Sequence, residues 1–243
     1  MNSWAILAAR NNAEWCDIVC RCHGKPGKFL PDIWINEDVT PPFYPNAVTL
    51  NSGSSAASDQ YRAIEHLTGK HIADDWAVKD SFSSLDLSDR GFRELLTAEW
   101  IYAPASLRVP ETDCDGARWA TIADSSRLFA WEIAWGGSGK LQECSLFLPS
   151  LLENDAQVII GAFQKEKIVA GCIANRSQNV VGISNIFLPD EGAERYRAGC
   201  VAAAIQWSNG LDLVGYESGG DLVAMQALGF EPIGGLTIWV RSP

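Results

Sequence analysis

"VVGISNIFLPDEGAERYRAGCVAAAIQWSNGLDLVGYESGGDLVAMQALGFEPIGGLTIWVRSP" (residues 180–243) is the stretch of this chain that decides its fold. Apolar runs alternate in it with segments of helical periodicity, which predict strands at 180–188, 211–217 and 234–241 and helices at 193–208 and 219–228. The pair Gly229-Phe230 ends the second helix and turns the chain into the last strand. Strands that alternate with helices in this way predict a mixed α/β fold.

The residues before this stretch add a hairpin and a strand–helix pair. "AQVIIGAFQKEKIVAGCIANR" (156–176) reads as two apolar strands joined by a short charged turn. "ARWATIA" (117–123) predicts another strand, and a helix is expected at 125–135, where polar residues can cap its start. With a further short helix expected at 143–152, the order from 117 to 241 is β, α, α, β, β, β, α, β, α, β.

The N-terminal half contains a weak echo of the C-terminal segment. "DWAVKDSF…DRGFRELLTAEWIY" (75–102) parallels "DLVGYESG…ALGFEPIGGLTIWV" (212–240), since each runs strand, helical piece, Gly-Phe, strand. Either the likeness arises by chance or this half is a partial copy of the C-terminal fold. The polar segment "SLRVPETDCDG" (106–116) is the best candidate linker and predicts domains at 1–113 and 114–243. The elements expected in this half are helices at 4–22 and 59–68, strands at 46–51, 76–82 and 98–104, and a short helix or turn at 87–96.

The composition excludes several classes of partner. The net charge is −11, from 30 acidic and 19 basic residues, whereas nucleic acid and anionic membrane surfaces both require clustered Lys and Arg. No apolar run approaches the roughly 18 residues of a membrane span, and no basic segment followed by an apolar one marks a signal peptide. The seven cysteines show no regular spacing, which predicts reduced thiols and a cytoplasmic protein.

The ending "ALGFEPIGG" (227–235), followed by an apolar strand, resembles the GCN5-related N-acetyltransferase (GNAT) superfamily, as does the order of elements from 117 to 241. The resemblance covers about half of the chain. It implies an α/β (α+β) fold with a mixed, mainly antiparallel sheet flanked by helices. The echo at 75–102 resembles, more weakly, the partial GNAT-like half of tandem members, and this implies a second, partial GNAT-like domain at 1–113.

The resemblance also implies a binding surface for acetyl-CoA. In this family two neighbouring strands splay apart, and the pantetheine arm of the cofactor adds along one of them through backbone hydrogen bonds. The matching strand here is Val180–Leu188, and the edge that would bind the cofactor is centred on Asn185, Ile186, Phe187 and Leu188. In the family, the next loop and the positive end of the next helix bind the diphosphate.

That diphosphate loop departs from the family pattern. The usual loop is Q/R-x-x-G-x-G/A, whereas this chain has "LPDEGAERYRAG" (188–199), in which Gly192 and Ala193 supply the turn. Three carboxylates stand where the diphosphate is expected, those of Asp190, Glu191 and Glu194. Like charges repel at such distances unless they are screened or paired, and Arg195 and Arg197 are the nearby cations that would offset them.

Candidate residues for proton transfer follow the strand at 211–217. Many members place a Tyr on the helix before Gly-Phe, where this chain has Met225, so Tyr216 is the candidate acid for the leaving thiolate. Glu217 is the candidate base for the substrate amine. Ser218 stands where an Asn often contacts the cofactor, although it equally fits a helix cap. Structural roles are the alternative for Tyr216 and Glu217 as well.

The helix expected at 125–135 lines the acceptor site in this family. It carries Trp131 and Trp135 on one face, which makes both candidates for substrate binding. Tryptophan on one helix face equally fits packing in the core. The helix could serve both purposes.

Cys16, Cys20, Cys22 and His23 crowd one helix end. Cys16 and Cys20 lie one turn apart on a single face. A structural zinc site needs four tetrahedral ligands and normally a second, distant pair. Buried free thiols on an apolar helix face are the commoner arrangement, so no metal site is predicted.

These features predict an N-acetyltransferase that moves an acetyl group from acetyl-CoA to a primary amine of a small molecule, by direct attack and without a covalent enzyme intermediate. One alternative is a GNAT-like binding or interaction module that has lost CoA binding, which the acidic loop favours. Another is an acyl-CoA hydrolase on the same scaffold, because fold alone does not fix function. The exposed strand edges of this fold are compatible with a homodimer.

Overall fold

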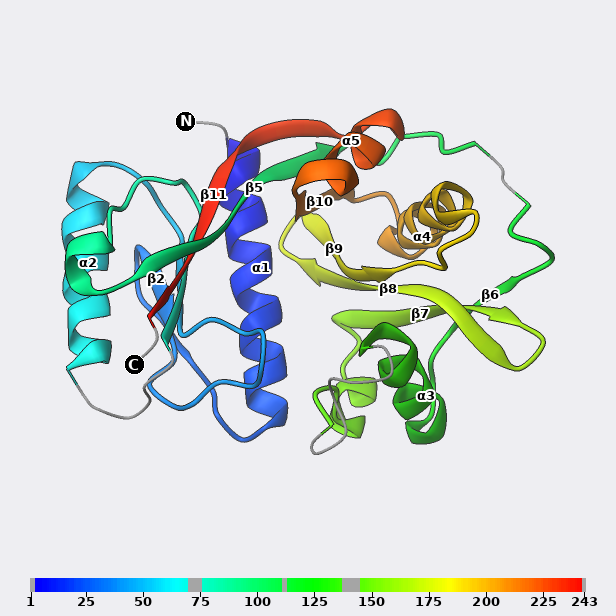
Figure 1. The fold of residues 1–243 in the computed structure, drawn as a ribbon, viewed down its shortest axis with the longest axis horizontal. Helices are drawn as coiled ribbons and strands as arrows, with labels where there is room; N and C mark the ends of the chain where they lie inside the picture. Colours follow the sequence, from blue (N-terminus) through cyan, green and yellow to red (C-terminus); the bar gives the residue numbers. More distant parts are fainter. Residues whose placement is uncertain (1–2, 70–75, 111–112, 137–144, 242–243) are drawn as a thin grey trace. The chain divides into compact units, whose positions relative to one another are not determined.

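The structure is a computed structural model that describes residues 3–69, 76–110, 113–136 and 145–241 (Figure 1). It has the mixed α/β fold expected from the sequence, with a mainly antiparallel sheet flanked by helices. The chain forms two compact units. Unit 1 holds the described residues of 1–101, 216–222 and 232–243, and unit 2 holds those of 102–215 and 223–231.

The strands of unit 1 follow the spatial order β1-β2-β3-β4-β11-β5. Strands β1 and β2, β2 and β3, and β4 and β11 pair antiparallel, whereas β3 and β4 pair in parallel. Figure 1 shows these strands between helices α1 and α2. The elements are α1 (Ser3–Cys22), β1 (Lys28–Phe29), β2 (Ile33–Ile35), β3 (Ala47–Thr49), α2 (Ser54–Thr68), β4 (Trp76–Asp80), η1 (Ser88–Arg90), β5 (Arg93–Ala103) and β11 (Glu231–Arg241).

Both helices of unit 1 bury apolar residues against its strands. Helix α1 packs against β3, and its small residues Ala9 and Ala13 are fully buried. Helix α2 contributes Ile64 and Leu67 to a core that also contains Trp76. Removing such apolar surface from water supplies most of the stabilisation of each layer.

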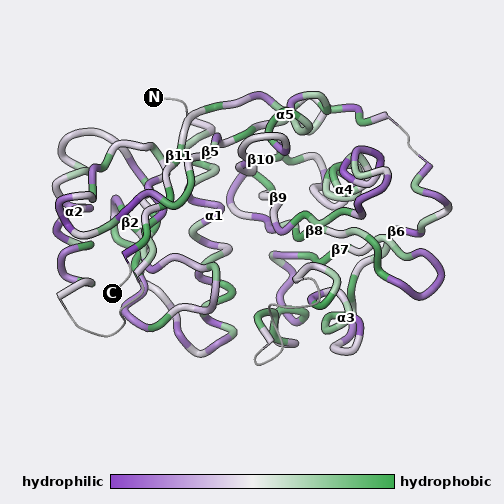
Figure 2. The backbone as a smooth tube through the Cα atoms, viewed as in Figure 1, coloured by the Kyte–Doolittle hydropathy of each residue, from purple (hydrophilic) through white to green (hydrophobic). Residues whose placement is uncertain are grey.

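The strands of unit 2 follow the spatial order β10-β9-β8-β7-β6, with only the β9–β10 pair parallel. Helices α3 and α4 lie on opposite faces of these strands (Figure 1), and the middle of β8 is among the most hydrophobic stretches of the chain (Figure 2). The elements are β6 (Arg118–Thr121), α3 (Ser125–Gly136), η2 (Pro149–Glu153), β7 (Gln157–Gln164), β8 (Lys167–Ser177), β9 (Val180–Phe187), α4 (Ala193–Ser208), β10 (Asp212–Glu217) and α5 (Gly219–Ala227).

The sequence echo corresponds to a repeated architecture. The parallel strands β3 and β4 are joined by α2, and the parallel strands β9 and β10 are joined by α4. Each pair continues through a helical segment to a glycine in the left-handed region, Gly91 or Gly229. A buried phenylalanine follows each glycine, Phe92 or Phe230, and then a strand of 11 residues. The two halves therefore share one order of elements.

Three sequence predictions differ in detail from the structure. Helix α2 begins at Ser54 rather than at 59. Within the segment 87–96, expected to be a short helix or turn, only Ser88–Arg90 form a 3-10 turn, because the left-handed Gly91 ends it and β5 starts at Arg93. The short helix expected at 143–152 begins outside the described residues; of its described part, 149–152 belong to the 3-10 helix η2 and 145–148 form no helix. The contiguous division at 113/114 stays a prediction, as does the linker at 106–116, part of which lies outside the described residues.

Two thiols of α1 lie in the core of unit 1. Cys16 is 2% exposed, and burial raises the pKa of its thiol from 9.0 to about 11, although the Lys79 charge lowers it in part. Between these two values the folded protein retains a proton that the unfolded chain has lost. The free energy of unfolding therefore falls as the pH rises through this interval, by up to about 1.4 kcal/mol per pH unit for one thiol.

We expect the Cys16→Ala variant to show a shallower alkaline loss of stability than the wild type. The substitution removes the titrating thiol, so the variant starts less stable near neutral pH but loses less above pH 9. Urea unfolding at about pH 8 and about pH 10 measures this difference. Val19→Ala is the matched control, because it also removes apolar volume from α1 but no titrating group. Equal alkaline losses in all three proteins would contradict the prediction.

Candidate functional site

Strands β9 and β10 separate part of the way along unit 2. They pair in parallel only where Val180–Gly182 faces Asp212–Val214. From Ile183 onward, no described strand pairs with that side of β9. The second half of β9 therefore keeps strand β8 on one edge and offers its other edge for pairing, which is the splay expected from the sequence.

A bulge marks the point where the two strands have separated. Ser184 lies opposite Ile173, but Phe187 lies opposite Gly171, so β9 has one residue more than β8 in this interval. Asn185 takes up the extra length with a φ of 52°, a left-handed conformation that Asn adopts more readily than most residues. A bulge of this kind turns backbone groups away from the ladder.

The burial of β9 changes at the same place. Its first four residues are buried and its last four are half-buried, and Leu188 after the strand is half-buried too. The predicted cofactor edge thus lies on the accessible half of the strand. An extended chain with amide groups could pair there with the backbone, as peptides do when they add to a free sheet edge.

The loop that follows β9 leads into the N-terminus of α4. Gly192 precedes the helix with a φ of 72° and no side chain caps this end. Its carbonyl accepts hydrogen bonds from the N–H groups of Arg195 and Tyr196. The N–H groups of Ala193 and Glu194 donate to no described residue. Free donors at the positive end of a helix are the groups that bind phosphate.

The acidic side chains of this loop point toward solvent rather than toward cations. Asp190, Glu191 and Glu194 are all exposed. None of them makes an ion pair with a described residue. Arg195, one of the two cations that the sequence suggested as an offset, forms an ion pair with Asp115. The helix end therefore combines three exposed carboxylates with free backbone donors.

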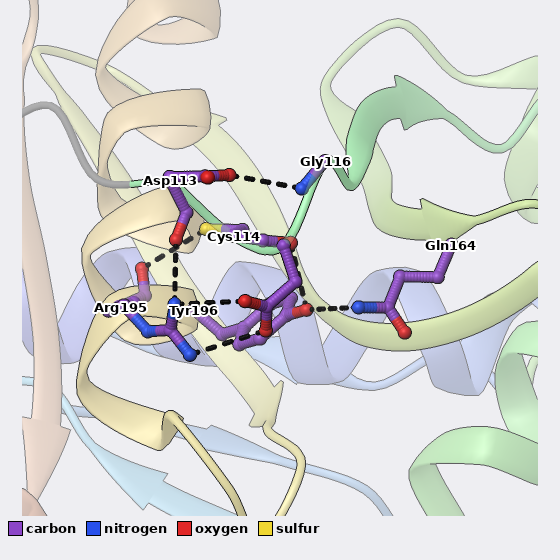
Figure 3. Close-up of polar contacts among 7 residues, drawn as sticks. Asp113, Cys114, Gly116, Gln164, Arg195 and Tyr196 are labelled. Atoms are coloured by element: carbon purple, nitrogen blue, oxygen red, sulfur yellow. Dashed lines mark hydrogen bonds and ion pairs between the residues drawn. The ribbon is translucent and has the colours of Figure 1, made fainter.

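Arg195 fastens α4 to the turn at 113–116, which we name the strap (Figure 3). Its two terminal nitrogens contact the two carboxylate oxygens of Asp115 at 3.0 and 3.2 Å, and one of them also donates to the carbonyl of Asp113 at 3.1 Å. These contacts raise the pKa of Arg195, mainly through the hydrogen bond to Asp115. The strap itself is closed by the N–H of Gly116, which donates to the Asp113 side chain.

A second set of contacts holds the strap from the buried side of α4 (Figure 3). The Tyr196 hydroxyl donates to the carbonyl of Cys114 at 2.9 Å and accepts from the Gln164 amide of β7 at 2.9 Å. The Cys114 thiol points at the carbonyl of Arg195. One turn further along α4, a Cβ on Gly199 would lie 2.2 Å from the ring of Trp119. The first turns of α4 are thereby fixed at both faces.

Helix α3 places the two predicted substrate-binding tryptophans differently. Trp131 is fully buried, donates from its indole to the carbonyl of Ile160 at 2.9 Å, and meets Phe187 edge-on at 5.2 Å. Trp135 is half-buried and stacks edge-on against Phe147 at 5.4 Å. Trp131 therefore acts on β9 by supporting Phe187, whereas Trp135 retains an accessible surface. Their binding roles stay predictions.

The predicted proton-transfer residues lie in unit 1. Tyr216 and Glu217 end β10 and are both half-buried. The Tyr216 hydroxyl accepts a hydrogen bond from the Lys79 ammonium at 3.3 Å, which leaves its own proton available for donation. The carbonyl of Ser218 accepts the N–H of Leu222, as expected for the residue that directly precedes α5. The catalytic and cofactor-contact roles of these residues stay predictions.

No group of three or more His, Cys, Asp or Glu side chains within the described ranges is arranged to hold a metal ion. Cys16 and Cys20 are buried free thiols, and Cys22 is a half-buried one. Among all the residues that the structure describes, no helix is both long and apolar enough to cross a membrane.

The sequence did not predict the residues that hold β9 and α4 in place, which are those of the strap and Gly171. The strap falls inside the segment that composition marks as a linker, and the only local sign of its turn is Asp115-Gly116, where both residues have positive φ. Gly171 of β8 has no distinguishing pattern in the sequence, yet it provides the space in which Trp131 and Phe187 meet. Such contacts join residues that are far apart in the chain, so periodicity cannot reveal them.

Comparison with known proteins identifies the fold. A scan against protein-family models and a search of curated sequences found no match. Among solved structures, a GCN5-related N-acetyltransferase from Kribbella flavida is similar at 15% identity and a TM-score of 0.65, over 97% of this chain and 96% of that one. A GNAT-family protein from Novosphingobium aromaticivorans has 12% identity, a TM-score of 0.56, and coverage of 94% and 96%. A tandem GNAT protein from the clavulanic acid biosynthesis pathway has 12% identity, a TM-score of 0.54, and coverage of 96% and 94%.

These similarities confirm the GNAT fold that the sequence indicated. They extend over nearly the whole chain, so the N-terminal half is included as well as the half that carries the sequence resemblance. At such low identity the likeness concerns the fold. What the protein does has to be argued from the geometry of β9, the loop after it and α4.

Proposed function

We propose that this GNAT-fold protein is an acyltransferase that moves an acetyl group from acetyl-CoA to a primary amine of a small molecule. The observation that carries the proposal is the free edge of β9 beyond Gly182, where pairing with β10 has ended and the residues become half-buried. A pantetheine arm has two amide groups along an extended chain, so it fits a strand edge that offers unpaired backbone groups.

The bulge in β9 is also proposed to take part in catalysis, by stabilising the charge that forms on the thioester oxygen. The register of β8 and β9 shifts at Asn185, and we propose that a backbone N–H freed by this shift donates to the carbonyl oxygen of a thioester. Hydrogen bonds to that oxygen stabilise the negative charge that forms on it when an amine attacks. The cofactor-contact residues proposed here are those predicted from the sequence, Asn185, Ile186, Phe187 and Leu188.

The N-terminus of α4 is the proposed diphosphate site. The N–H groups of Ala193 and Glu194 are free donors, Gly192 brings the backbone close, and the helix dipole adds positive potential. The strap supports this role because it anchors the first turn of α4 through Arg195 and Tyr196. Fixed donors lose less entropy on binding than mobile ones do.

The proposed reaction is a direct transfer. The amine nitrogen forms a bond to the thioester carbon, the C–S bond breaks, and the thiolate leaves as CoA. Glu217 would take the proton from the amine, and Tyr216 would give one to the thiolate. The accessible face of Trp135 would contact the acceptor, and Ser218 the cofactor. Each of these roles is a proposal that rests on residue type and on placement at an element end.

A second candidate function is a GNAT-fold module that binds a partner without acyl transfer. It is favoured by the exposed acids at 190, 191 and 194, and by the use of Arg195 in holding the strap. In this reading the strap and α4 form a rigid surface whose negative side chains would repel a diphosphate. The two functions differ in whether acetyl-CoA binds at the end of α4.

Calorimetric titration with acetyl-CoA separates the two functions. We expect micromolar binding to the wild type, and about tenfold weaker binding to Ala193→Glu. Ala193→Gln is the matched control, since it has the same size without the charge, and it should retain most of the affinity. Glu is well tolerated in the first turn of a helix, so the charged variant should still fold. No binding to the wild type at millimolar acetyl-CoA would discard the transferase in favour of the module.

We further expect that the double variant Glu191→Gln, Glu194→Gln binds acetyl-CoA more tightly than the wild type does. Removing two like charges from the edge of a diphosphate site should strengthen binding roughly tenfold at low salt, and less at high salt. Glu153→Gln, an exposed acid elsewhere in unit 2, should leave the affinity unchanged. Equal affinities in all three proteins would place the diphosphate away from this loop.

A further inference from the structure

Lys79 is a buried cation in strand β4 of unit 1. Only 4% of the residue is exposed. Because side chains alternate along a strand, Lys79 points to the face opposite that of Val78 and Asp80. The hydrogen bond from its ammonium to the Asn12 side chain at 2.7 Å shows that helix α1 covers this face. Lysine is almost never fully buried unless it is paired, so the partners of Lys79 indicate its role.

The ammonium contacts neutral partners. They are the amide oxygen of Asn12, the hydroxyl of Tyr216 at 3.3 Å, and the ring of the same tyrosine at 4.3 Å from its centroid. Lys79 forms no ion pair with any carboxylate of the described residues. The nearby Cys16 thiol keeps its proton at neutral pH, because burial raises its pKa to about 11.

The carboxylates nearest in the sequence are engaged elsewhere. Asp17 of α1 pairs with Arg21. Asp80 accepts hydrogen bonds from backbone N–H groups of the turn that follows β4, on the opposite face of the sheet. Of the groups that contact the Lys79 ammonium, only the Tyr216 hydroxyl can become an anion, because an amide such as that of Asn12 does not ionise.

Two neighbours hold the ring of Tyr216, and β4 positions both of them. Lys79 lies over the ring, and the buried Trp100 packs edge-on against it at 5.4 Å between ring centroids. The Trp100 indole in turn donates to the carbonyl of Ser81 at 2.7 Å. Ser81 directly follows β4 and is two residues from Lys79. The same short segment therefore fixes Tyr216 through a side chain and through a backbone carbonyl.

The contact with Lys79 also fixes the direction of the hydrogen bond. An ammonium has three donors and no acceptor, so the Tyr216 oxygen must accept at this contact. The proton of the Tyr216 hydroxyl is then directed to another acceptor. A neighbouring hydroxyl would not impose this direction, because a hydroxyl both donates and accepts. Lys79 thus sets Tyr216 as a donor.

The sequence echo puts these two residues at corresponding positions. "DWAVKDSF" (75–82) and "DLVGYESG" (212–219) align without a gap, and Lys79 then stands opposite Tyr216. The N-terminal half therefore has a cation where the C-terminal half has a phenol. In unit 1 this cation contacts that phenol. The echo makes the pair a meeting of equivalent strand positions from the two halves.

We propose that Lys79 positions Tyr216 as the acid of the acyl transfer and stabilises the tyrosinate that forms when Tyr216 protonates the leaving thiolate. This role rests on the proposed transferase function. The proton moves from the phenol oxygen to the sulfur, and water later returns a proton to that oxygen. The new negative charge lies beside an ammonium whose other contacts are neutral. A charge-assisted hydrogen bond is roughly twice as strong as a neutral one, so Lys79 binds this state more strongly than the initial one, which raises kcat.

The rate of thiol release from acetyl-CoA tests this role, with ethanolamine, benzylamine and spermidine offered singly as acceptors. We expect Lys79→Met to lower kcat at least about tenfold and to leave the KM for acetyl-CoA within about twofold of the wild type. Lys79→Gln, which keeps a donor without the charge, should be intermediate. Lys28→Met, which removes an exposed lysine, should leave both constants unchanged.

A second substitution separates positioning from a purely structural role. If Lys79 acts through Tyr216, the double variant Lys79→Met, Tyr216→Phe should have the same kcat as Tyr216→Phe alone. A structural lysine would lower kcat by the same factor in both backgrounds. Thermal unfolding checks that the variants fold. Lys79→Met should unfold no earlier than the wild type, because it replaces a buried charge that has no anionic partner.

Carbon-13 NMR tests the contact without turnover, in protein whose tyrosines are labelled at the ring carbon that bears the hydroxyl. The Tyr216 signal is the one lost in Tyr216→Phe. We expect Lys79→Met to shift it and Lys28→Met not to.

The outcomes separate this role from the transferase itself. No thiol release by the wild type with any of the three amines would overturn the transferase and this role of Lys79 together. An active wild type with an equally active Lys79→Met would overturn the role of Lys79 alone. The same conclusion would follow from a full loss of kcat on top of Tyr216→Phe, or from an unshifted Tyr216 signal in Lys79→Met.

Discussion

Gly171→Ala is expected to destabilise the protein by about 3 kcal/mol, near the upper end of what overpacking costs in a core. A Cβ at this position would lie 2.5 Å from the carbonyl oxygen of Ile160, 2.5 Å from the indole nitrogen of Trp131 and 2.8 Å from the ring of Phe187. The first of these atoms is backbone and cannot move without disturbing β7. Urea unfolding of the variant and the wild type measures the difference.

The same substitution should also weaken acetyl-CoA binding, because Phe187 belongs to the half of β9 that we assign to the cofactor. The added methyl pushes its ring away from Trp131 and so alters the strand just after the bulge. Gly235→Ala is the matched control in a strand, since its new Cβ would meet nothing closer than 3.4 Å. We expect that control to be neutral or mildly stabilising. A Gly171→Ala protein as stable as the control would show that β8 can relax around the methyl group.

The elements that the sequence predicted well are those with a strong local pattern. Helix α4 runs from Ala193 to Ser208, the bounds expected from its periodicity. The hairpin of β7 and β8 appears where two apolar runs flank Lys165, a residue with positive φ at the turn. In both cases the short-range pattern and the turn residues agree with the final packing. Where they agree, the secondary structure of a segment can be predicted from sequence.

The structure of the strap could not be predicted from a local sequence pattern. Its residues are polar and include a glycine, which is the composition of a linker. Its structure depends on Arg195 and Tyr196, about eighty positions later in the chain. The offset of the acidic loop by Arg195 stays a prediction, because its terminal nitrogens bind Asp115 while no ion pair joins it to Glu191 or Glu194.

The tryptophans of α3 illustrate a limit of periodicity. Helical spacing correctly puts Leu128 and Trp131 on the buried face. It does not say whether a buried face meets core or pocket, because this depends on residues from other strands. Here Gly171 and Phe187 complete the surroundings of Trp131, so its ring belongs to the support of β9 and only Trp135 keeps an accessible surface.

The proposed site thus has two parts. The local sequence predicts the free strand edge, but it does not predict the tertiary contacts that hold this edge and α4 in place. The unpaired half of β9 and the free N–H groups of α4 follow from where two strands separate and where a helix starts. The positions of these backbone groups depend on Gly171, which lets Trp131 and Phe187 pack together next to β9, and on the strap, which holds the first turn of α4. Binding groups held by packed neighbours reach a productive geometry at lower entropic cost than groups on mobile loops.

Glu132→Ala is expected to have the other large effect, a loss of about 3 kcal/mol in the free energy of unfolding. Glu132 is a buried residue of α3 with 3% exposure. Its carboxylate accepts hydrogen bonds from the backbone N–H groups of Leu146 and Phe147, and from the Ser145 hydroxyl at 2.6 Å. Alanine removes this acceptor from two buried backbone donors at once, and both residues are nearly inaccessible to water.

The loss should reach the aromatic cluster beside the proposed acceptor face. Phe147 packs edge-on against Trp131 at 5.6 Å and Trp135 at 5.4 Å, so release of its backbone should weaken the near-ultraviolet circular dichroism of these tryptophans. Glu132→Gln keeps one acceptor oxygen and should be intermediate, and Ser145→Ala, which removes only the hydroxyl, should cost about 1 kcal/mol. If Glu132→Ala unfolded within about 0.5 kcal/mol of the wild type, the segment after α3 would have to be held by its apolar packing instead. The carboxylate would then be free for the chemistry of an acceptor site.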